Sequence, residues 1–141
     1  MTNGIDSALT RVRQSGGRVT TAKRAVLEEL HLGEHLTADD LASRVHSRHS
    51  GVHVSTVYRT LDQFEALGIV THVHLGHGRA TFHLADDRHH HAVCEKCHDV
   101  IELPADLLDA IELRLRDTLG FVAHTHHFAI EGRCAECATP D

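Results

Sequence analysis

Apolar residues recur at helical spacing through the first half of the chain, between short breaks. The spacing predicts a helix over residues 5–14 and a second helix over residues 22–31, with Thr20 or Thr21 able to cap its N-terminus. Thr37 begins a pattern that resembles a capping box and predicts a third helix. The first half of the chain is therefore expected to be mainly helical.

A fourth helix is predicted after a polar, turn-like stretch over residues 47–53. Ser55 can cap this helix, and Gly68 stands just past its expected end. Its apolar residues fall at i, i+4, i+7 and i+10 and form a single stripe, which consists of Val57, Leu61, Phe64 and Leu67. One face of the helix should therefore be buried.

The period of the pattern changes after Gly68. Residues 69–75 alternate like a strand, residues 75–78 form a predicted turn, and residues 80–84 alternate like a return strand. Three of these four helices followed by a β-hairpin are the arrangement of a winged helix-turn-helix. We therefore expect a winged-helix domain, with its hinge, over residues 1–85.

Residues 86–141 predict a second, smaller domain. The pattern indicates a strand over residues 100–103, a helix over residues 104–119 and a strand over residues 121–132. The inward side of the helix is expected to carry Leu107, Leu108, Ile111 and Leu115. A domain of about 55 residues has a thin core and needs a metal or a partner chain. The whole chain is thus predicted to be an α+β protein with a small C-terminal α/β domain.

The composition excludes several classes of protein. Of 141 residues, 41% are hydrophobic, 24% are charged and only 2 are proline, so the whole chain should fold. No apolar run reaches the roughly 18 residues of a membrane span, and the N-terminal residues predict no signal peptide. Aromatic residues make up 4%, which argues against a stacking platform for single-stranded nucleic acid. We therefore expect a cytoplasmic protein that does not bind membranes.

Charge is unevenly distributed along the chain, although the formal net charge is −6. Residues 1–85 carry 9 basic and 8 acidic side chains, whereas residues 86–141 carry 5 basic and 12 acidic ones. A polyanion would therefore meet the N-terminal part of the chain. A bound divalent cation would offset part of the negative charge of the C-terminal part.

The four cysteines form two C-x2-C pairs, Cys94 with Cys97 and Cys134 with Cys137, separated by 36 residues. Two such turns can complete a tetrahedral site with Zn–S distances near ~2.3 Å. In a chain with no secretion signal, this pattern favours structural zinc over a pair of disulfides or a thiol redox switch. A closed site of this kind has no open coordination position, so we expect no catalysis there.

Histidine is the most unusual feature of the composition, with 16 residues, of which seven lie between His72 and His91. Neutral imidazole is the commonest protein ligand for transition metals, so the clustering favours metal binding over a histidine-rich surface loop. In an extended segment His89 and His91 point to one side and His90 to the other. His72 and His74 alternate in the same way. Further histidines near the C-terminus are His124, His126 and His127.

Three segments together resemble the ferric uptake regulator family: residues 54–61 (VSTVYRTL), residues 89–97 (HHHAVCEKC) and residues 134–137 (CAEC). The resemblance covers nearly the whole chain. It implies a dimeric, metal-responsive bacterial repressor with an N-terminal winged helix and a C-terminal dimerisation domain over residues 86–141. Residues 72–86 are most similar to the nickel-responsive branch of the family found in actinobacteria.

The resemblance also implies DNA-binding residues. The fourth predicted helix is similar to the recognition helix of the family, whose polar side chains would contact the major groove and phosphates of double-stranded operator DNA. Arg18 matches a position that often contacts the DNA backbone, and Lys23 replaces a common Gln with a phosphate-binding group. The complete implied set is Arg18, Lys23, Ser55, Thr56, Tyr58 and Arg59.

The regulatory metal site of the family, at the junction of its two domains, matches His35, His83, His89 and His91. His83 stands where iron sensors usually have Glu and peroxide sensors Asp. An all-nitrogen ligand set favours Ni²⁺, Zn²⁺ or Co²⁺ over Fe²⁺ or Mn²⁺, with Fe²⁺ kept as an alternative. Asp87 occupies a position from which the nickel branch also takes a ligand, and this departure leaves the ligand set open.

Two further metal sites are implied by the resemblance. One belongs to the nickel branch and matches His72, His74 and His127, and the other matches His90, Asp109 and His126. A metal that joins the two domains would favour a closed dimer with its recognition helices about one DNA turn, roughly 34 Å, apart. Without metal, DNA affinity would fall.

Three other functions fit part of the pattern. A peroxide-sensing regulator would come from the same family, but position 83 lacks the Asp of peroxide sensors. A nickel or zinc storage or delivery protein would explain the histidines but not the recognition helix. A zinc enzyme would need a separate base, and the sequence contains no H-E-x-x-H motif. We therefore expect neither an enzyme nor a small organic substrate.

Overall fold

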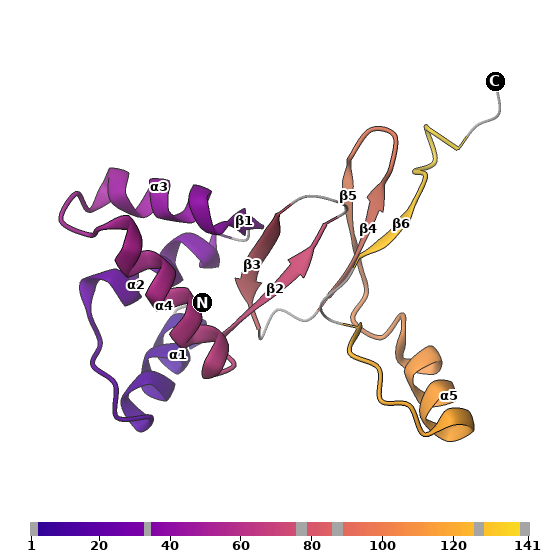
Figure 1. Cartoon of the computed structure of the whole chain (residues 1–141), viewed down its shortest axis with the longest axis horizontal. Coiled ribbons are helices and arrows are strands. Elements are labelled where there is room, and N and C mark those ends of the chain that lie inside the picture. Colours follow the sequence, from indigo (N-terminus) through magenta and orange to yellow (C-terminus); the bar gives the residue numbers. More distant parts are fainter. Residues whose placement is uncertain (1–2, 33–34, 76–78, 86–88, 126–128, 139–141) are drawn as a thin grey trace. The chain divides into compact units, whose positions relative to one another are not determined.

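The computed structural model describes residues 3–32, 35–75, 79–85, 89–125 and 129–138. Its elements in chain order (Figure 1) are α1 (Asn3–Gln14), α2 (Thr21–His31), β1 (Leu36–Thr37), α3 (Ala38–Arg48), α4 (Val54–Ala66), β2 (Val70–His74), β3 (Ala80–Leu84), β4 (His90–Cys94), β5 (Val100–Leu103), α5 (Asp109–Leu119) and β6 (Ile130–Gly132). They form two compact units. The first unit consists of Met1–His72 and Ala80–Asp87, and the second of Val73–Arg79 and Arg88–Asp141.

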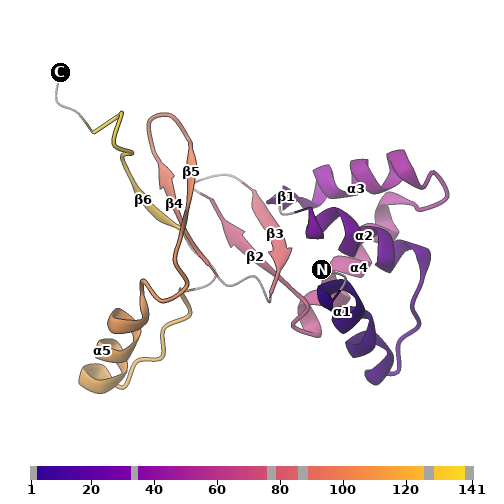
Figure 2. The same ribbon diagram turned by 180° about the vertical axis from the view of Figure 1, so that it is seen from behind.

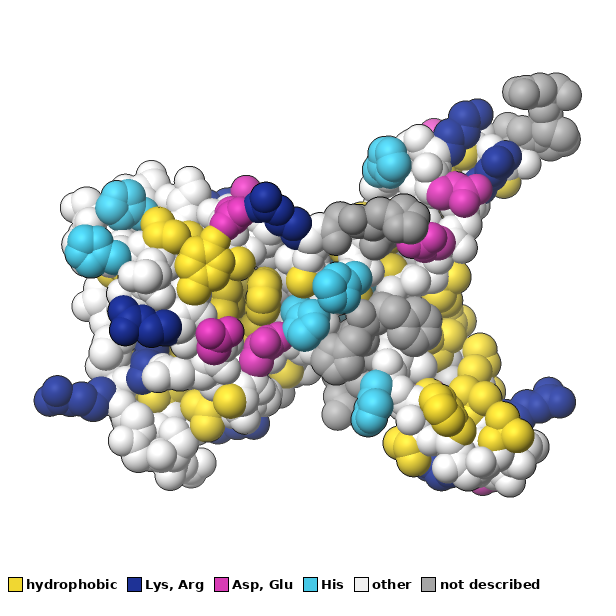
Figure 3. All heavy atoms as spheres, viewed as in Figure 1, with side chains coloured by type: hydrophobic (Ala, Val, Ile, Leu, Met, Phe, Trp, Pro, Cys, Tyr) yellow, Lys and Arg dark blue, Asp and Glu magenta, His cyan; other side chains and the backbone are white. Residues whose placement is uncertain are grey.

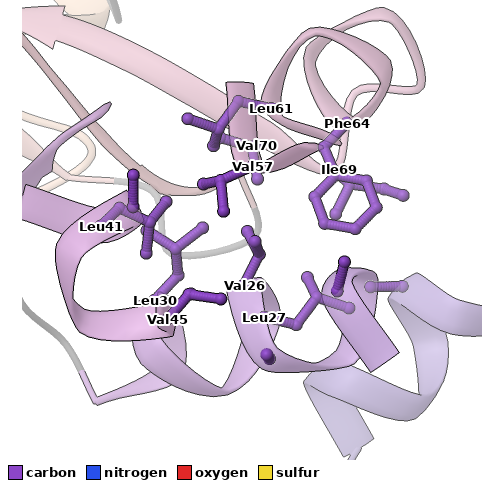
Figure 4. Packing of buried hydrophobic residues seen from close by; sticks show 14 of the residues in the cluster. Val26, Leu27, Leu30, Leu41, Val45, Val57, Leu61, Phe64, Ile69 and Val70 are labelled. Atoms are coloured by element: carbon purple, nitrogen blue, oxygen red, sulfur yellow. The ribbon is translucent and has the colours of Figure 1, made fainter. Parts of the chain in front are cut away.

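The core of the first unit is formed by the apolar faces of α1 to α4. Val26, Leu41 and Phe64 are fully buried there, with further aliphatic side chains packed around them (Figure 4). Burial of such a side chain is worth roughly 1.5–3 kcal/mol relative to leaving it exposed. The predicted stripe of α4 is confirmed for Val57, Leu61 and Phe64, whereas Leu67 is half-buried at the end of the helix.

Threonine side chains begin two helices of this unit. Thr20 Oγ1 accepts a hydrogen bond from the backbone N–H of Lys23, and Thr37 Oγ1 accepts one from Asp40. Both caps are as the sequence predicts. The prediction for Ser55 is wrong, because α4 already begins at Val54 and its N-cap, His53, makes no side-chain cap hydrogen bond.

A three-stranded sheet of order β1-β3-β2 completes the winged helix. The very short β1 pairs antiparallel with β3, with Leu36 opposite Phe82. Two residues carry no periodic pattern, so the sequence did not predict β1. The hairpin strands β2 and β3 correspond to the predicted alternation, and the winged-helix part of the α+β prediction is confirmed.

Arg11 on α1 caps the C-terminal end of α4. Its Nη2 donates to the carbonyl oxygen of Leu67 at 2.6 Å, and its Nη1 donates to that of Gly68 at 3.1 Å. Gly68 has a φ of +66°, the left-handed conformation that commonly ends a helix. The guanidinium therefore satisfies terminal carbonyls and lies at the negative end of the helix dipole.

Replacing Arg11 by alanine should lower the free energy of unfolding of the first unit by about 1 to 2 kcal/mol, since charge-assisted hydrogen bonds to the end of α4 are lost. Arg13→Ala is the matched control, because Arg13 is exposed on the same helix. Its effect should stay within about 0.5 kcal/mol. Urea denaturation, monitored by hydrogen exchange of the α4 amides, measures the change in free energy of unfolding for both substitutions. Equal effects of the two substitutions would contradict the capping role.

The second unit contains a sheet of order β5-β4-β6. The central strand β4 pairs antiparallel with β5, with Val93 opposite Val100, and parallel with β6, with Cys94 opposite Gly132. Two predicted boundaries are wrong. The helix begins at Asp109 rather than at residue 104, and β6 covers only Ile130–Gly132 because residues 121–125 pair with no described strand.

The helix of the second unit exposes apolar residues that were expected to face inward. Leu108 is buried, but Leu107 is 49% exposed and Ile111 is 54% exposed. Figure 2 shows that α5 stands away from the sheet of its own unit, and Figure 3 shows hydrophobic side chains gathered on its surface. The expectation of an inward face within this chain is therefore wrong for Leu107 and Ile111.

The core of the second unit is correspondingly thin. Among the described residues, its buried hydrophobic side chains outside the hairpin are Val93, Cys94 and Leu108. None of the described helices is long and apolar enough to cross a membrane.

Candidate metal centres and recognition helix

The four cysteines converge at one end of the sheet of the second unit. Cys94 ends β4, and Cys134 follows β6 by two residues. Parallel pairing of β4 with β6 brings these two points together, and Glu95 extends the pairing by donating its N–H to the Gly132 carbonyl at 2.8 Å. The sulfur atoms of Cys94, Cys97, Cys134 and Cys137 all lie within 4.8 Å of one another.

The geometry of the thiols fits a tetrahedral zinc ion. In a tetrahedron with Zn–S distances near ~2.3 Å, the sulfur atoms are about 3.8 Å apart. The Sγ atoms of Cys97 and Cys134 are 3.8 Å apart. The predicted cysteine cluster is thus confirmed as a cluster, and its donor set suits Zn²⁺.

The thiols of the cluster differ in how readily they lose a proton. The backbone N–H of Cys97 points at the Cys94 sulfur from 3.5 Å and lowers the pKa of the Cys94 thiol to about 6. The pKa of the Cys137 thiol is raised to about 12, mainly by its hydrogen bond with the Cys134 thiol and, to a smaller extent, by burial. The pKa values of the Cys94 and Cys137 thiols are therefore shifted in opposite directions, and Cys137 holds its proton more tightly than an isolated thiol does. Metal binding must displace that proton, so zinc affinity should fall as the pH falls.

The histidine run at the start of β4, residues 89–91, divides between two faces, as its extended conformation predicts. The rings of His89 and His91 lie edge to face with their centroids 4.5 Å apart. His90 points to the other face of the strand, where its Nε2 donates a hydrogen bond to the Ala105 carbonyl oxygen at 3.0 Å. Glu102 on the neighbouring segment has an oxygen 3.9 Å from His89 Nε2. The second unit therefore presents a histidine pair with an adjacent carboxylate.

The first unit presents a second histidine pair. The rings of His35 and His83 have centroids 5.4 Å apart at 66°. His83 is 8% exposed, and its Nδ1 lies 3.1 Å from the Leu84 carbonyl oxygen. Because a carbonyl can only accept, Nδ1 carries the proton, and Nε2 is the nitrogen suited to a metal.

The residues of the two further sites are less completely described. His72 is half-buried and His74 exposed on β2, whereas His127 lies outside the described residues.

Of the other set, His90 is buried and Asp109 is exposed in the first turn of α5, and His126 lies outside the described residues. Asp87 also lies outside them.

The polar face of α4 is available to a partner of the first unit. Ser55, Tyr58 and Arg59 are exposed, and Thr56 is half-buried. Tyr58 donates its hydroxyl hydrogen to Asp39 in the first turn of α3, so the phenol is held in place. Arg18 is exposed just before α2, whereas Lys23 is half-buried and donates its ammonium hydrogen to the Arg18 carbonyl at 2.7 Å.

Two contacts beside these residues were missed in the sequence. Asp39 contacts Tyr58, and Glu65 contacts the imidazole of His72. Each contact joins two elements, and nothing in the local pattern of either residue indicates its partner. A carboxylate on a helix surface usually belongs to the solvated face.

The fold and these sites define a metal-binding winged-helix protein. The model of the ferric uptake regulator family matches residues 14–131, and the chain belongs to this family. It is 30% identical over 135 residues to the peroxide operon regulator of Bacillus subtilis, covering 95% of this chain and 93% of that one. It is 31% identical over 134 residues to the ferric uptake regulation protein of Neisseria meningitidis serogroup C, covering 93% of each chain.

A solved structure agrees with the same assignment. The ferric uptake regulator from Pseudomonas aeruginosa with manganese superposes with a TM-score of 0.70 at 31% identity, covering 89% of this chain and 96% of that one. The resemblance to the family is confirmed. Relatives named for ferric uptake and relatives named for peroxide response both match, so the branch is not decided by these similarities.

Proposed function

We propose that this protein is a metal-responsive transcriptional repressor that binds double-stranded operator DNA as a homodimer. The observation that carries the proposal is the combination of an amphipathic α4, with Tyr58 and Arg59 on its exposed face, and a histidine pair on each unit. The first feature suits a recognition helix. The second suits a metal ion as the signal.

The proposed DNA contacts are made by the winged-helix unit. Tyr58 and Arg59 would reach base edges and phosphates from α4, together with Ser55 and Thr56. Arg18 would bind a phosphate directly. Lys23 is engaged with the Arg18 carbonyl, so we propose that it shapes the segment that carries Arg18 and adds positive charge near the DNA.

The proposed regulatory site takes its ligands from both units. His35 and His83 come from the first, and His89 and His91 from the second. A metal ion bound by both pairs would tie the units together and favour the dimer that fits the operator. Four imidazole nitrogens favour Ni²⁺ or Zn²⁺, with Fe²⁺ as the alternative, and the nickel branch of the family is the one we propose.

The remaining metals are proposed as follows. Zn²⁺ in the cysteine cluster would be structural, since four sulfur ligands leave no open position. His72 and His74, with His127, would form a hairpin site. A site built from His90, Asp109 and His126 ranks third, because His90 already donates one ring N–H to Ala105 and only its Nδ1 would face a metal.

The exposed apolar surface of the second unit supports the homodimer. Among its described residues, the large exposed hydrophobic side chains are Val100, Ile101, Leu107, Ile111, Leu113, Leu119, Phe121, Val122 and Ile130. A patch of this kind on a unit with so thin a core is typical of an interface. We therefore propose residues 86–141 as the dimerisation domain and residues 1–85 as the DNA-binding domain, in a cytoplasmic protein without catalytic activity.

Peroxide sensing is the second candidate, because the Bacillus subtilis relative is named for a peroxide operon. His83 argues against it, since an additional imidazole in place of a carboxylate disfavours Fe²⁺. Storage or delivery of nickel or zinc leaves the polar face of α4 without a role.

Fluorescence anisotropy on DNA from the protein's own promoter region tests the proposal. Zinc-loaded protein freed of its other metals is titrated anaerobically with Ni²⁺, Zn²⁺, Fe²⁺ or Mn²⁺. One metal should raise DNA affinity by roughly 5- to 150-fold, and Arg59→Ala should weaken binding with every metal. An affinity that no metal changes, on any promoter fragment that binds, would contradict the proposal.

A further inference from the structure

A polar contact joins the recognition helix to the hairpin. Oε1 of Glu65, in the last turn of α4, contacts Nδ1 of His72 on β2. The ring of Phe82 on β3 lies against the same imidazole, with the centroids 6.0 Å apart. The imidazole thus contacts a carboxylate and lies beside an aromatic ring.

This arrangement is suited to metal binding. With Nδ1 bound to the carboxylate, Nε2 is the nitrogen through which His72 would bind an ion. His72 is 35% exposed, so an ion can reach it. His74 follows two residues along the same strand, and its side chain therefore leaves the strand on the same face.

The position of Glu65 gives the contact a second consequence. Glu65 lies on α4 about two turns from Tyr58 and adjoins the end of the helix that Arg11 caps through Leu67 and Gly68. The C-terminal end of α4 therefore makes two kinds of contact. It accepts hydrogen bonds from Arg11, and through Glu65 it contacts His72, a candidate metal ligand.

We propose that Glu65 is a positioning residue, which orients His72 for a divalent transition metal at the hairpin and links occupancy of that site to α4. The inference rests on the hairpin site of the proposed function. A metal on Nε2 makes the Nδ1–H a stronger donor, so it tightens the hydrogen bond to Glu65 and steadies the recognition helix. A carboxylate behind a histidine ligand is the usual outer partner in metal sites.

The test compares Glu65→Gln with Asp62→Asn in the full-length, zinc-loaded protein. Asp62 is exposed one turn earlier on the same helix, so the control removes the same charge. Ni²⁺ titration is followed through the ¹⁵N resonances of the His72 and His74 imidazoles. Glu65→Gln should weaken Ni²⁺ binding at these residues by about 10- to 100-fold, and Asp62→Asn should leave it within about twofold.

A second measurement is made on the protein before Ni²⁺ is added. In the wild type the His72 imidazole should carry its proton on Nδ1, and Glu65→Gln should shift the tautomer balance, which a merely electrostatic role would not do. Glu65→Asp keeps the carboxylate and should recover part of the Ni²⁺ affinity. Amide spectra of α4 verify that the variants are folded.

The outcomes separate this inference from the function on which it rests. If the His72→Ala, His74→Ala double variant binds as much Ni²⁺ as the wild type, the hairpin site does not exist and the inference fails with it. If the double variant loses one Ni²⁺ but Glu65→Gln binds like Asp62→Asn, the site stands and the role of Glu65 is overturned. Metal-dependent DNA binding in the double variant reports on the His35 site alone.

Discussion

Replacing Cys97 by serine should remove the proposed structural zinc, unfold the second unit and abolish the proposed dimer. Zinc content should fall from one ion per chain in the cysteine cluster to none. The reason is that the second unit buries few hydrophobic side chains among its described residues, and β6 is held at its edge by only three residue pairs. The cluster ties the end of β6 to the end of β4.

Cys97 is the most informative of the four cysteines because its side chain is exposed, so serine creates no cavity. Lys96→Ala in the same turn is the control, since it changes an exposed side chain without touching the sulfur ligands. Metal analysis, analytical ultracentrifugation and hydrogen exchange of the β4 amides measure the three effects.

The first unit should survive the loss of zinc. Its core is formed mainly by α1–α4 together with Ile69 and Val70, and it includes no cysteine. The helices of this unit should therefore unfold in a separate transition at higher denaturant concentration. Removal of zinc from the wild type by a strong chelator should reproduce the result. A Cys97→Ser protein that stays dimeric with protected β4 amides would show that the cluster does not stabilise the second unit.

Replacing His35 by alanine should leave the zinc cluster and the dimer intact but remove the metal dependence of DNA binding. His35 is a proposed ligand on the first unit, and its ring lies beside that of His83. Without it, a metal on the second unit would have lost half of its attachment to the winged helix. The metal-induced gain in DNA affinity, roughly 5- to 150-fold in the wild type, should fall to about one.

His31→Ala is the matched control for this substitution. His31 is exposed in the last turn of α2, only four residues earlier, and it belongs to none of the proposed sites. Anisotropy titrations with and without Ni²⁺ measure the gain for each variant. A His35→Ala protein whose operator binding still responds to metal as His31→Ala does would exclude His35 as a regulatory ligand.

The periodic parts of the fold were predictable because local sequence carries their signal. The stripe of α4 and the caps at Thr20 and Thr37 depend on residues within one or two helical turns. The helix over residues 104–119 was predicted too long, and of its expected inward residues Leu108 is buried but Leu107 and Ile111 are exposed. Its apolar spacing is real, but periodicity does not say which molecule covers an apolar face.

The metal ligands were predictable to different degrees. The C-x2-C spacing by itself indicates a pair of thiolates, and the extended His89–His91 run indicates two faces. The contacts of Glu65 with His72 and of Asp39 with Tyr58 had no such signal. In each the partners come from different elements, and a surface carboxylate has the same local pattern whether or not it has a partner.

The sequence by itself thus determined the winged helix, the two cysteine pairs and the pair of His89 and His91, because each depends on spacing along a helix, strand or turn. Only the tertiary structure decided that the four sulfur atoms share one site, since parallel pairing of β4 with β6 joins segments far apart in the chain. It also decided that α5 keeps its apolar face exposed and that Glu65 reaches His72. Those outcomes depend on which surfaces meet when the elements pack, and spacing along one element does not contain that information.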